Sequence, residues 1–196
     1  MIWALRKIEV QPGYCLLLAA LLLLVPLPWA AGWFLATACH EFGHYLMLRL
    51  LHVPTHRICI AVSGIRMETG PMDSCQEGLA ALAGPLCGSM LMLLARWVPE
   101  AAVCAFVQSI YNLLPLYPLD GGRILRCIAA SVFVPENARR LCTIVGWMVR
   151  IFVAAGILWC VLCLRWGWAP LIWGGILLFS KEAAKFPCNE GKVGVQ

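Results

Sequence analysis

Charged side chains are scarce in this sequence. Only 13% of its 196 residues are Asp, Glu, Lys or Arg, whereas 62% are hydrophobic. Soluble domains carry about twice that share of charge. No acidic or basic side chain stands between Glu9 and His40, a stretch longer than the roughly 20 residues that cross the hydrocarbon core of a bilayer. These absences exclude a water-soluble protein and indicate a membrane protein.

Other features are missing as well. The net charge of +5 comes from basic residues dispersed between apolar segments, so no nucleic-acid partner is expected. The eleven cysteines are an odd number and stand mostly singly, which favours buried thiols in a reducing compartment over a disulfide framework. No repeat, low-complexity tract or second soluble domain is visible, so residues 1–196 are interpreted as a single intramembrane domain.

Proline, glycine and charged residues interrupt the apolar sequence. The runs between them predict helices over residues 14–30, 32–51, 78–95, 101–116, 141–164 and 167–179. The connection after the second helix is polar, and its residues 57–67 are rich in Ile and Val around Gly64, which favours a short strand or hairpin. The predicted fold is an all-α polytopic membrane protein with about six transmembrane helices and one small β element.

Basic residues set the expected orientation. With Arg6 and Lys7 inside, successive crossings place nearly all other Lys and Arg residues on the cytoplasmic side, together with both termini. Arg150 falls within the fifth predicted helix, where it has to snorkel or pair.

The amino-terminal segment has a second interpretation. Two basic residues, a Leu-rich run to Leu24 and the small residues Ala30 and Ala31 also fit a cleavable signal peptide. Cleavage would leave His40 near a new amino terminus on an outer surface, and would remove the partner of the second helix. A retained first helix is therefore preferred.

An HExxH sequence runs from His40 to His44. On a helix, residues four apart share one face, so both imidazoles can bind one zinc ion. Glu41 then stands beside the metal, where its carboxylate can take a proton from water and pass it to a leaving amine. With this content of His and Glu, chance produces the motif on the order of a few times in a thousand such sequences.

A catalytic zinc ion commonly has three protein ligands, and the two histidines supply only two. The chain has two aspartates, Asp73 and Asp120. Asp120 follows an apolar helix, and the nearby prolines and Gly121-Gly122 allow the backbone to unwind and turn a carboxylate inward. Asp120 is the predicted third ligand. It could instead cap a helix over 121–134, and both roles could coexist.

Asn112 lies about two helical turns before Asp120. Its amide could bind the substrate backbone or an oxyanion, or it could satisfy carbonyl groups freed by Pro115, and the sequence favours neither. Gly84, Pro85 and Gly88 are interpreted as a surface for close helix packing.

With HExxH in one helix and Asn112 to Gly122 ending a later one, the sequence resembles the site-2 protease family of intramembrane metalloproteases. The resemblance spans roughly residues 40–126 and includes Ala83-Gly84-Pro85. It implies that His40, His44 and Asp120 bind Zn²⁺ and that Glu41 is the catalytic base.

The subgroup is indicated by the Asn-Leu-Leu-Pro and Pro-Leu-Asp-Gly-Gly-Arg segments. They look most like the stage IV sporulation protein FB branch, whose members release pro-sigma-K from its membrane-associated form during sporulation. No PDZ-sized insertion separates the motifs, and little chain follows residue 179. These features argue against the branch that cleaves anti-sigma factors and against ATP-responsive members.

The implied function is hydrolysis of a peptide bond in a transmembrane or membrane-associated protein, near the cytoplasmic side of the lipid bilayer. The substrate is expected to unwind and pair as a strand with residues 57–67, where Gly64 is a candidate substrate-binding residue. An inhibitory membrane partner is compatible with this function. A metal-binding transporter and an inactive scaffold are the alternatives. Glu41 argues against a transporter, which has no evident need for a base, and the presence of every expected catalytic residue argues against an inactive scaffold.

Overall fold

The computed structural model describes residues 8–61 and 64–162. The described elements, in chain order, are β1 (Ile8–Val10), α1 (Pro12–Leu24), α2 (Leu27–Leu50), β2 (Thr55–Ala61), β3 (Gly64–Thr69), α3 (Ser74–Ser89), the 3₁₀ helix η1 (Met90–Leu94), α4 (Pro99–Asn112), α5 (Asp120–Val132) and α6 (Pro135–Leu162). The last predicted helix, over residues 167–179, lies outside the described residues.

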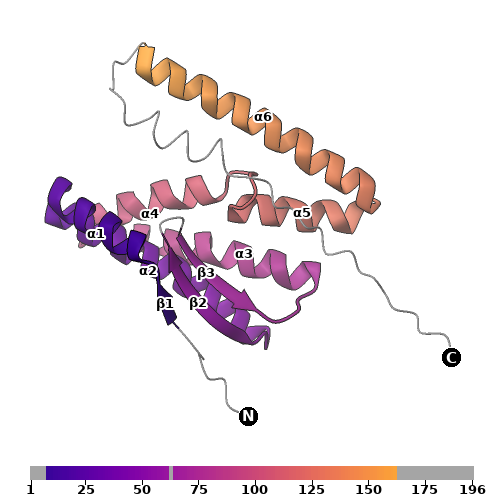
Figure 1. The fold of residues 1–196 in the computed structure, drawn as a ribbon, viewed down its shortest axis with the longest axis horizontal. Helices are drawn as coiled ribbons and strands as arrows, with labels where there is room; N and C mark the ends of the chain where they lie inside the picture. The colour runs from indigo at the N-terminus through magenta and orange to yellow at the C-terminus, as the bar shows by residue number, and fades with distance from the viewer. Residues whose placement is uncertain (1–7, 62–63, 163–196) are drawn as a thin grey trace.

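The predicted hairpin after the second helix is confirmed. β2 and β3 pair antiparallel, with Ile60 opposite Ile65, and the short strand β1 adds to the other edge of β2 in parallel. The order is β1-β2-β3, so β2 is the central strand. Met67 of β3 packs against a buried cluster that contains Leu48 of α2 and Ala80 of α3, which fixes the sheet beside these two helices (Figure 1).

The helical core is built around α2, which packs against both α3 and α4. Buried side chains at this junction are small: Ala36 of α2 and Ala105 of α4 contact Leu91 of η1. Gly32 of α2 lies so close to α4 that an added Cβ would stand 2.8 Å from the amide nitrogen of Ala101. Small residues therefore allow the helix backbones to approach closely, as in other membrane bundles. α5 packs on α3, and α6 packs on α5 (Figure 1).

Several helix boundaries differ from the predicted ones: α3 begins at Ser74 instead of residue 78, and α4 ends at Asn112 instead of residue 116. The first two helices separate at Val25 and Pro26 rather than at residue 31, because a residue before proline is disfavoured in helical conformation and both residues adopt extended backbone. Gly32 is then free to serve the contact with α4 inside α2. α5 is a separate element, as in the alternative in which Asp120 caps a helix over 121–134, but its N-cap is Leu119 and Asp120 is its first residue. α6 begins at Pro135, six residues before the predicted start.

Two helical segments are long and apolar enough to cross a membrane, Ser74–Leu94 and Pro135–Trp159, and α1 is a shorter apolar helix. Arg150 lies inside the second segment and is 8% exposed, with its guanidinium carbon 5.6 Å from the ring centroid of Trp147. An arginine in such a helix is thus paired with an aromatic face, which partly offsets its cost in an apolar setting.

Substitution of Gly32 by alanine is expected to destabilise the α2–α4 junction, because the new methyl group meets the backbone of α4. The expected loss is about 1–3 kcal/mol, the usual effect of overpacking. Gly156→Ala in α6 is the matched control, since nothing lies within 4 Å of its added Cβ. Thermal unfolding in detergent should show a lower midpoint for Gly32→Ala only. Equal midpoints would contradict the close packing.

Candidate metal centre

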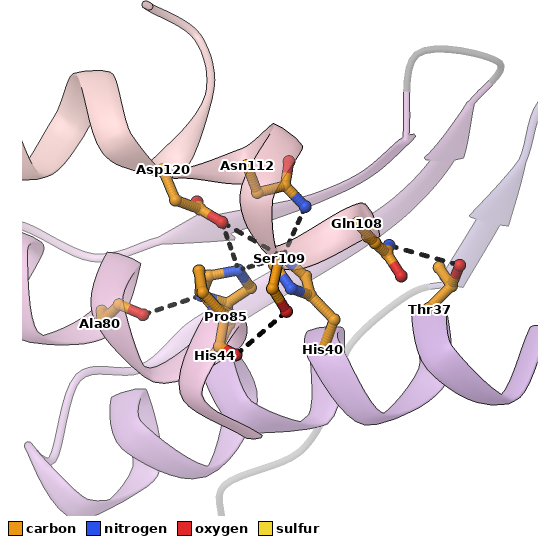
Figure 2. Close-up of polar contacts among 9 residues, drawn as sticks. All are labelled: Thr37, His40, His44, Ala80, Pro85, Gln108, Ser109, Asn112 and Asp120. Atoms are coloured by element: carbon orange, nitrogen blue, oxygen red, sulfur yellow. Dashed lines mark hydrogen bonds and ion pairs between the residues drawn. The ribbon is translucent and has the colours of Figure 1, made fainter. Parts of the chain in front are cut away.

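His40 and His44 lie one turn apart on the same face of α2. Their Nε2 atoms are 3.1 Å apart, and the rings meet edge to face. His40 is 3% exposed, and its Nδ1 has no hydrogen-bond partner among the described residues. The two imidazoles therefore point their outer nitrogens at one place inside the bundle (Figure 2).

The backbone of α3 determines how His44 is oriented. Its Nδ1 donates a hydrogen bond of 2.7 Å to the carbonyl oxygen of Ala80, which leaves Nε2 of the neutral ring as a lone-pair donor for a metal. The ring lies directly over Gly84, where an added Cβ would be only 2.2 Å from Nε2. Gly84 is thus more than the packing residue that the sequence indicated, because it makes the space for a ring that could bind a metal ion.

Asp120 reaches the histidines from a different part of the chain. It is the first residue of α5, and it is 8% exposed. Its Oδ2 lies 3.1 Å from Nε2 of His40 and 3.2 Å from Nε2 of His44. The carboxylate faces the histidines in Figure 2, so Asp120 begins a helix and contributes to the cluster at the same time.

The spacing of these three donor atoms fits a metal ion. All of them lie within 4.8 Å of one another. Ligand atoms about 2.0–2.1 Å from one tetrahedral zinc ion are about 3.3 Å apart, close to the three distances above. Two histidines and one aspartate, with one further position open, are also a donor set typical of catalytic zinc.

α4 lines the other side of the cluster. Its last residue, Asn112, places its side-chain nitrogen 3.3 Å from Nε2 of His40. One turn earlier, Ser109 donates a hydrogen bond of 3.3 Å to the carbonyl oxygen of Pro85. Gln108 donates to the hydroxyl oxygen of Thr37 across 3.4 Å, so polar contacts join α4 to both α2 and α3 (Figure 2).

No family model matches the sequence, and no curated protein sequence matches it either. The Site-2 Protease from Methanocaldococcus jannaschii has a similar solved structure, with a TM-score of 0.63 over 91% of this chain and 91% of that chain, at 18% sequence identity. The fold is that of a site-2 protease. The likeness covers nearly all of both chains, so it extends beyond the segment from His40 to Arg126 on which the sequence resemblance rested.

Within this site-2 protease fold, Glu41 follows His40 directly on α2. Its carboxylate is partly buried and lies near enough to His44, Asp120 and Arg123 to interact with them electrostatically. Glu41 thus stands beside the cluster, as a base that acts on a metal-activated water must.

Not every predicted site residue is brought to the cluster. Gly64 is the first residue of β3, and no described contact connects it with His40, His44 or Asp120. The structure also adds groups that the sequence did not indicate: the carbonyl of Ala80, and Gln108 and Ser109 of α4. A backbone carbonyl has no sequence signal, whereas polar residues one turn before Asn112 on an apolar helix were a signal that could have been used.

Replacement of Gly84 by alanine should displace the imidazole of His44. Metal affinity is expected to fall about 10- to 100-fold, as it does when groups that orient metal ligands are changed. Gly88→Ala is the control on the same helix, because its added Cβ would lie 3.4 Å from Ser109 Oγ and 3.7 Å from His40 Cβ, in ordinary contact. Zinc dissociation constants from chelator competition would measure both, and unchanged affinity in Gly84→Ala would contradict the assigned geometry.

Proposed function

We propose that this protein is an intramembrane zinc metalloprotease that hydrolyses a peptide bond of a transmembrane or membrane-associated protein near the cytoplasmic side. The observation that carries the proposal is the convergence of His40, His44 and Asp120 beside Glu41, inside an apolar bundle with the site-2 protease fold. A bundle held together by helix packing alone would not require three metal-ligating atoms to face one point.

The chemistry is divided among few residues. His40, His44 and Asp120 would hold the zinc ion, which would supply a Lewis acid for the scissile carbonyl and the attacking water. Glu41 takes a proton from the water as its oxygen bonds to the carbonyl carbon, and it delivers that proton to the amine when the C–N bond breaks. The amide nitrogen of Asn112, at the rim of the same cluster, donates to the oxyanion or to the substrate backbone.

The cytoplasmic position is supported by α2 itself. Arg49 lies in its last turn, and basic residues near helix ends mark the cytoplasmic side. His44 is five residues before Arg49, which is about 7.5 Å along the helix axis. A centre at this depth suits a multi-pass protein that cuts near the cytoplasmic surface.

The substrate strand is proposed to add to β3. Within the described sheet, β2 is hydrogen-bonded on both sides, by β1 and by β3. The expected pairing of the substrate with residues 57–67 is therefore assigned to the part of this segment that lies in β3. β3 is six residues long and has one edge unpaired in the described sheet, whereas β1 has three residues. Backbone pairing at such an edge tolerates different side chains, and Gly64 at its start leaves room for the incoming chain.

The proposed branch within the site-2 protease family rests on sequence motifs. Asn-Leu-Leu-Pro and Pro-Leu-Asp-Gly-Gly-Arg support a place in the stage IV sporulation protein FB branch, with a membrane-associated pro-sigma factor as substrate. An inhibitory membrane partner remains part of this proposal.

Glu41→Gln and Asp120→Ala separate catalysis from metal binding. Glu41→Gln should keep about one zinc ion per chain yet lose about 10²- to 10⁴-fold in cleavage rate, because only the proton-transferring group is changed. Asp120→Ala should lose both metal and cleavage. Metal analysis of protein purified in detergent, with cleavage of single-span reporters whose spans carry Gly, Asn or Pro near the cytoplasmic end, measures both quantities.

The control is Glu136→Gln on α6, whose carboxylate is exposed and pairs only with Arg140 among the described residues. It should match the wild type in zinc content and rate. If Glu41→Gln cuts as fast as the wild type, the mechanism is wrong. Zinc binding without cleavage of any reporter would favour a transporter or an inactive scaffold.

A further inference from the structure

Of the three proposed metal ligands, Asp120 is the one that does not lie on α2, the helix that contains the HExxH motif. His40 and His44 are fixed relative to each other by one turn of α2, whereas Asp120 belongs to α5. Its distance from the histidines therefore depends on the contacts that hold α5 against the rest of the bundle.

One arginine on α5 makes several of those contacts. Arg126, six residues after Asp120, forms an ion pair with Glu77 of α3. The two side chains are 13% and 18% exposed, whereas Arg140 and Glu136 of α6 are 72% and 66% exposed. Two largely desolvated charges are costly unless they are paired, so this pair strongly constrains where α5 can lie.

The same guanidinium also contacts the loop that leads to Asp120. Its carbon lies 5.5 Å from the ring centroid of Tyr117, within cation–π range. That loop is folded tightly onto the first turn of α5: an added Cβ on Gly121 would stand 2.2 Å from the carbonyl oxygen of Leu113. Arg126 thus holds the loop before Asp120 and the helix after it.

The partner of Arg126 connects to the other half of the metal site. Glu77 lies three residues, or just under one turn, before Ala80 on α3, and the carbonyl of Ala80 accepts the hydrogen bond from His44. The element that orients His44 is therefore joined by an ion pair to the element that carries Asp120.

From these contacts we infer that Arg126, with Glu77 and Tyr117, is a positioning residue for the metal centre. It sets the distance between Asp120 and the two histidines without touching the metal. This inference rests on the proposed metal centre and assigns a function to an ion pair outside it. A purely structural pair would stabilise the fold and leave metal affinity unchanged.

The test is zinc and cobalt(II) binding to the purified full chain in detergent. Arg126→Gln and Glu77→Gln should each weaken zinc binding about 10- to 100-fold and alter the visible spectrum of bound cobalt, which reports ligand geometry. Because a single change leaves one buried charge unpaired, the double variant Glu77→Gln/Arg126→Gln is included, with the same expected loss. Arg126→Lys, which keeps the charge, should recover most of the affinity, and Tyr117→Phe, which keeps the ring, should bind like the wild type.

Arg140→Gln, which breaks an exposed pair on α6, is the control and should change neither readout. Unfolding midpoints of the metal-free proteins show whether each variant is folded. If the Gln variants have lower midpoints but the zinc affinity and cobalt spectrum of the wild type, the positioning role is wrong and the pair is structural. If the wild type itself binds no zinc, the proposed metal centre fails together with this inference. If the wild type binds zinc and the Gln variants bind it equally well, only this inference fails.

Discussion

The close approach of α2 and α3 is the constraint on which the centre depends. Gly43, between the two histidines, and Gly84 face each other's helices: an added Cβ on Gly43 would lie 2.4 Å from the carbonyl oxygen of Ala83, and one on Gly84 would collide with the ring of His44. Only at this separation can His44 reach the carbonyl of Ala80. The second of the two variable positions between Glu41 and His44 in HExxH is thus occupied here by Gly43, the residue that allows the two helices to pack closely.

Polar contacts around the cluster follow from the apolar setting. Where lipid replaces water, polar side chains have to find partners within the protein. Ser109 donates a hydrogen bond to the carbonyl of Pro85 and Gln108 donates one to Thr37, so polar contacts hold α4 against α3 and α2. These contacts hold α4 in place, and with it the amide of Asn112 beside His40. Hydrogen bonds therefore hold α4 and Asn112 beside the site, whereas the small residues allow the helices to pack closely.

The parts of the structure that are encoded locally are predictable from the sequence. The spacing of His40 and His44 depends only on helix geometry, and the hairpin depends on a β-favouring run interrupted by Gly64, so both were predictable. Asp120 was found by elimination, because the chain offers only one other aspartate. The strand β1 was missed since three residues carry no periodic signal, and the position of Gly32 inside α2 was missed because only contact with α4 explains it. The features that the sequence does not predict are tertiary contacts, such as which backbone atoms lie against a glycine or an imidazole.

Charge balance gives a reason for this combination of residues in a membrane. The carboxylates of Asp120 and Glu41 carry two negative charges, which a divalent cation bound at the site would cancel. Interactions between charges are strong where the dielectric constant is low, so opposite charges that lie close together are favoured there, and Arg123 beside Glu41 adds to this attraction. When Glu41 accepts a proton from the attacking water, negative charge moves from its carboxylate to the substrate oxygen, and the total does not change. The proposed reaction thus moves negative charge between groups of one site, which costs far less in an apolar bundle than the creation of a new charge.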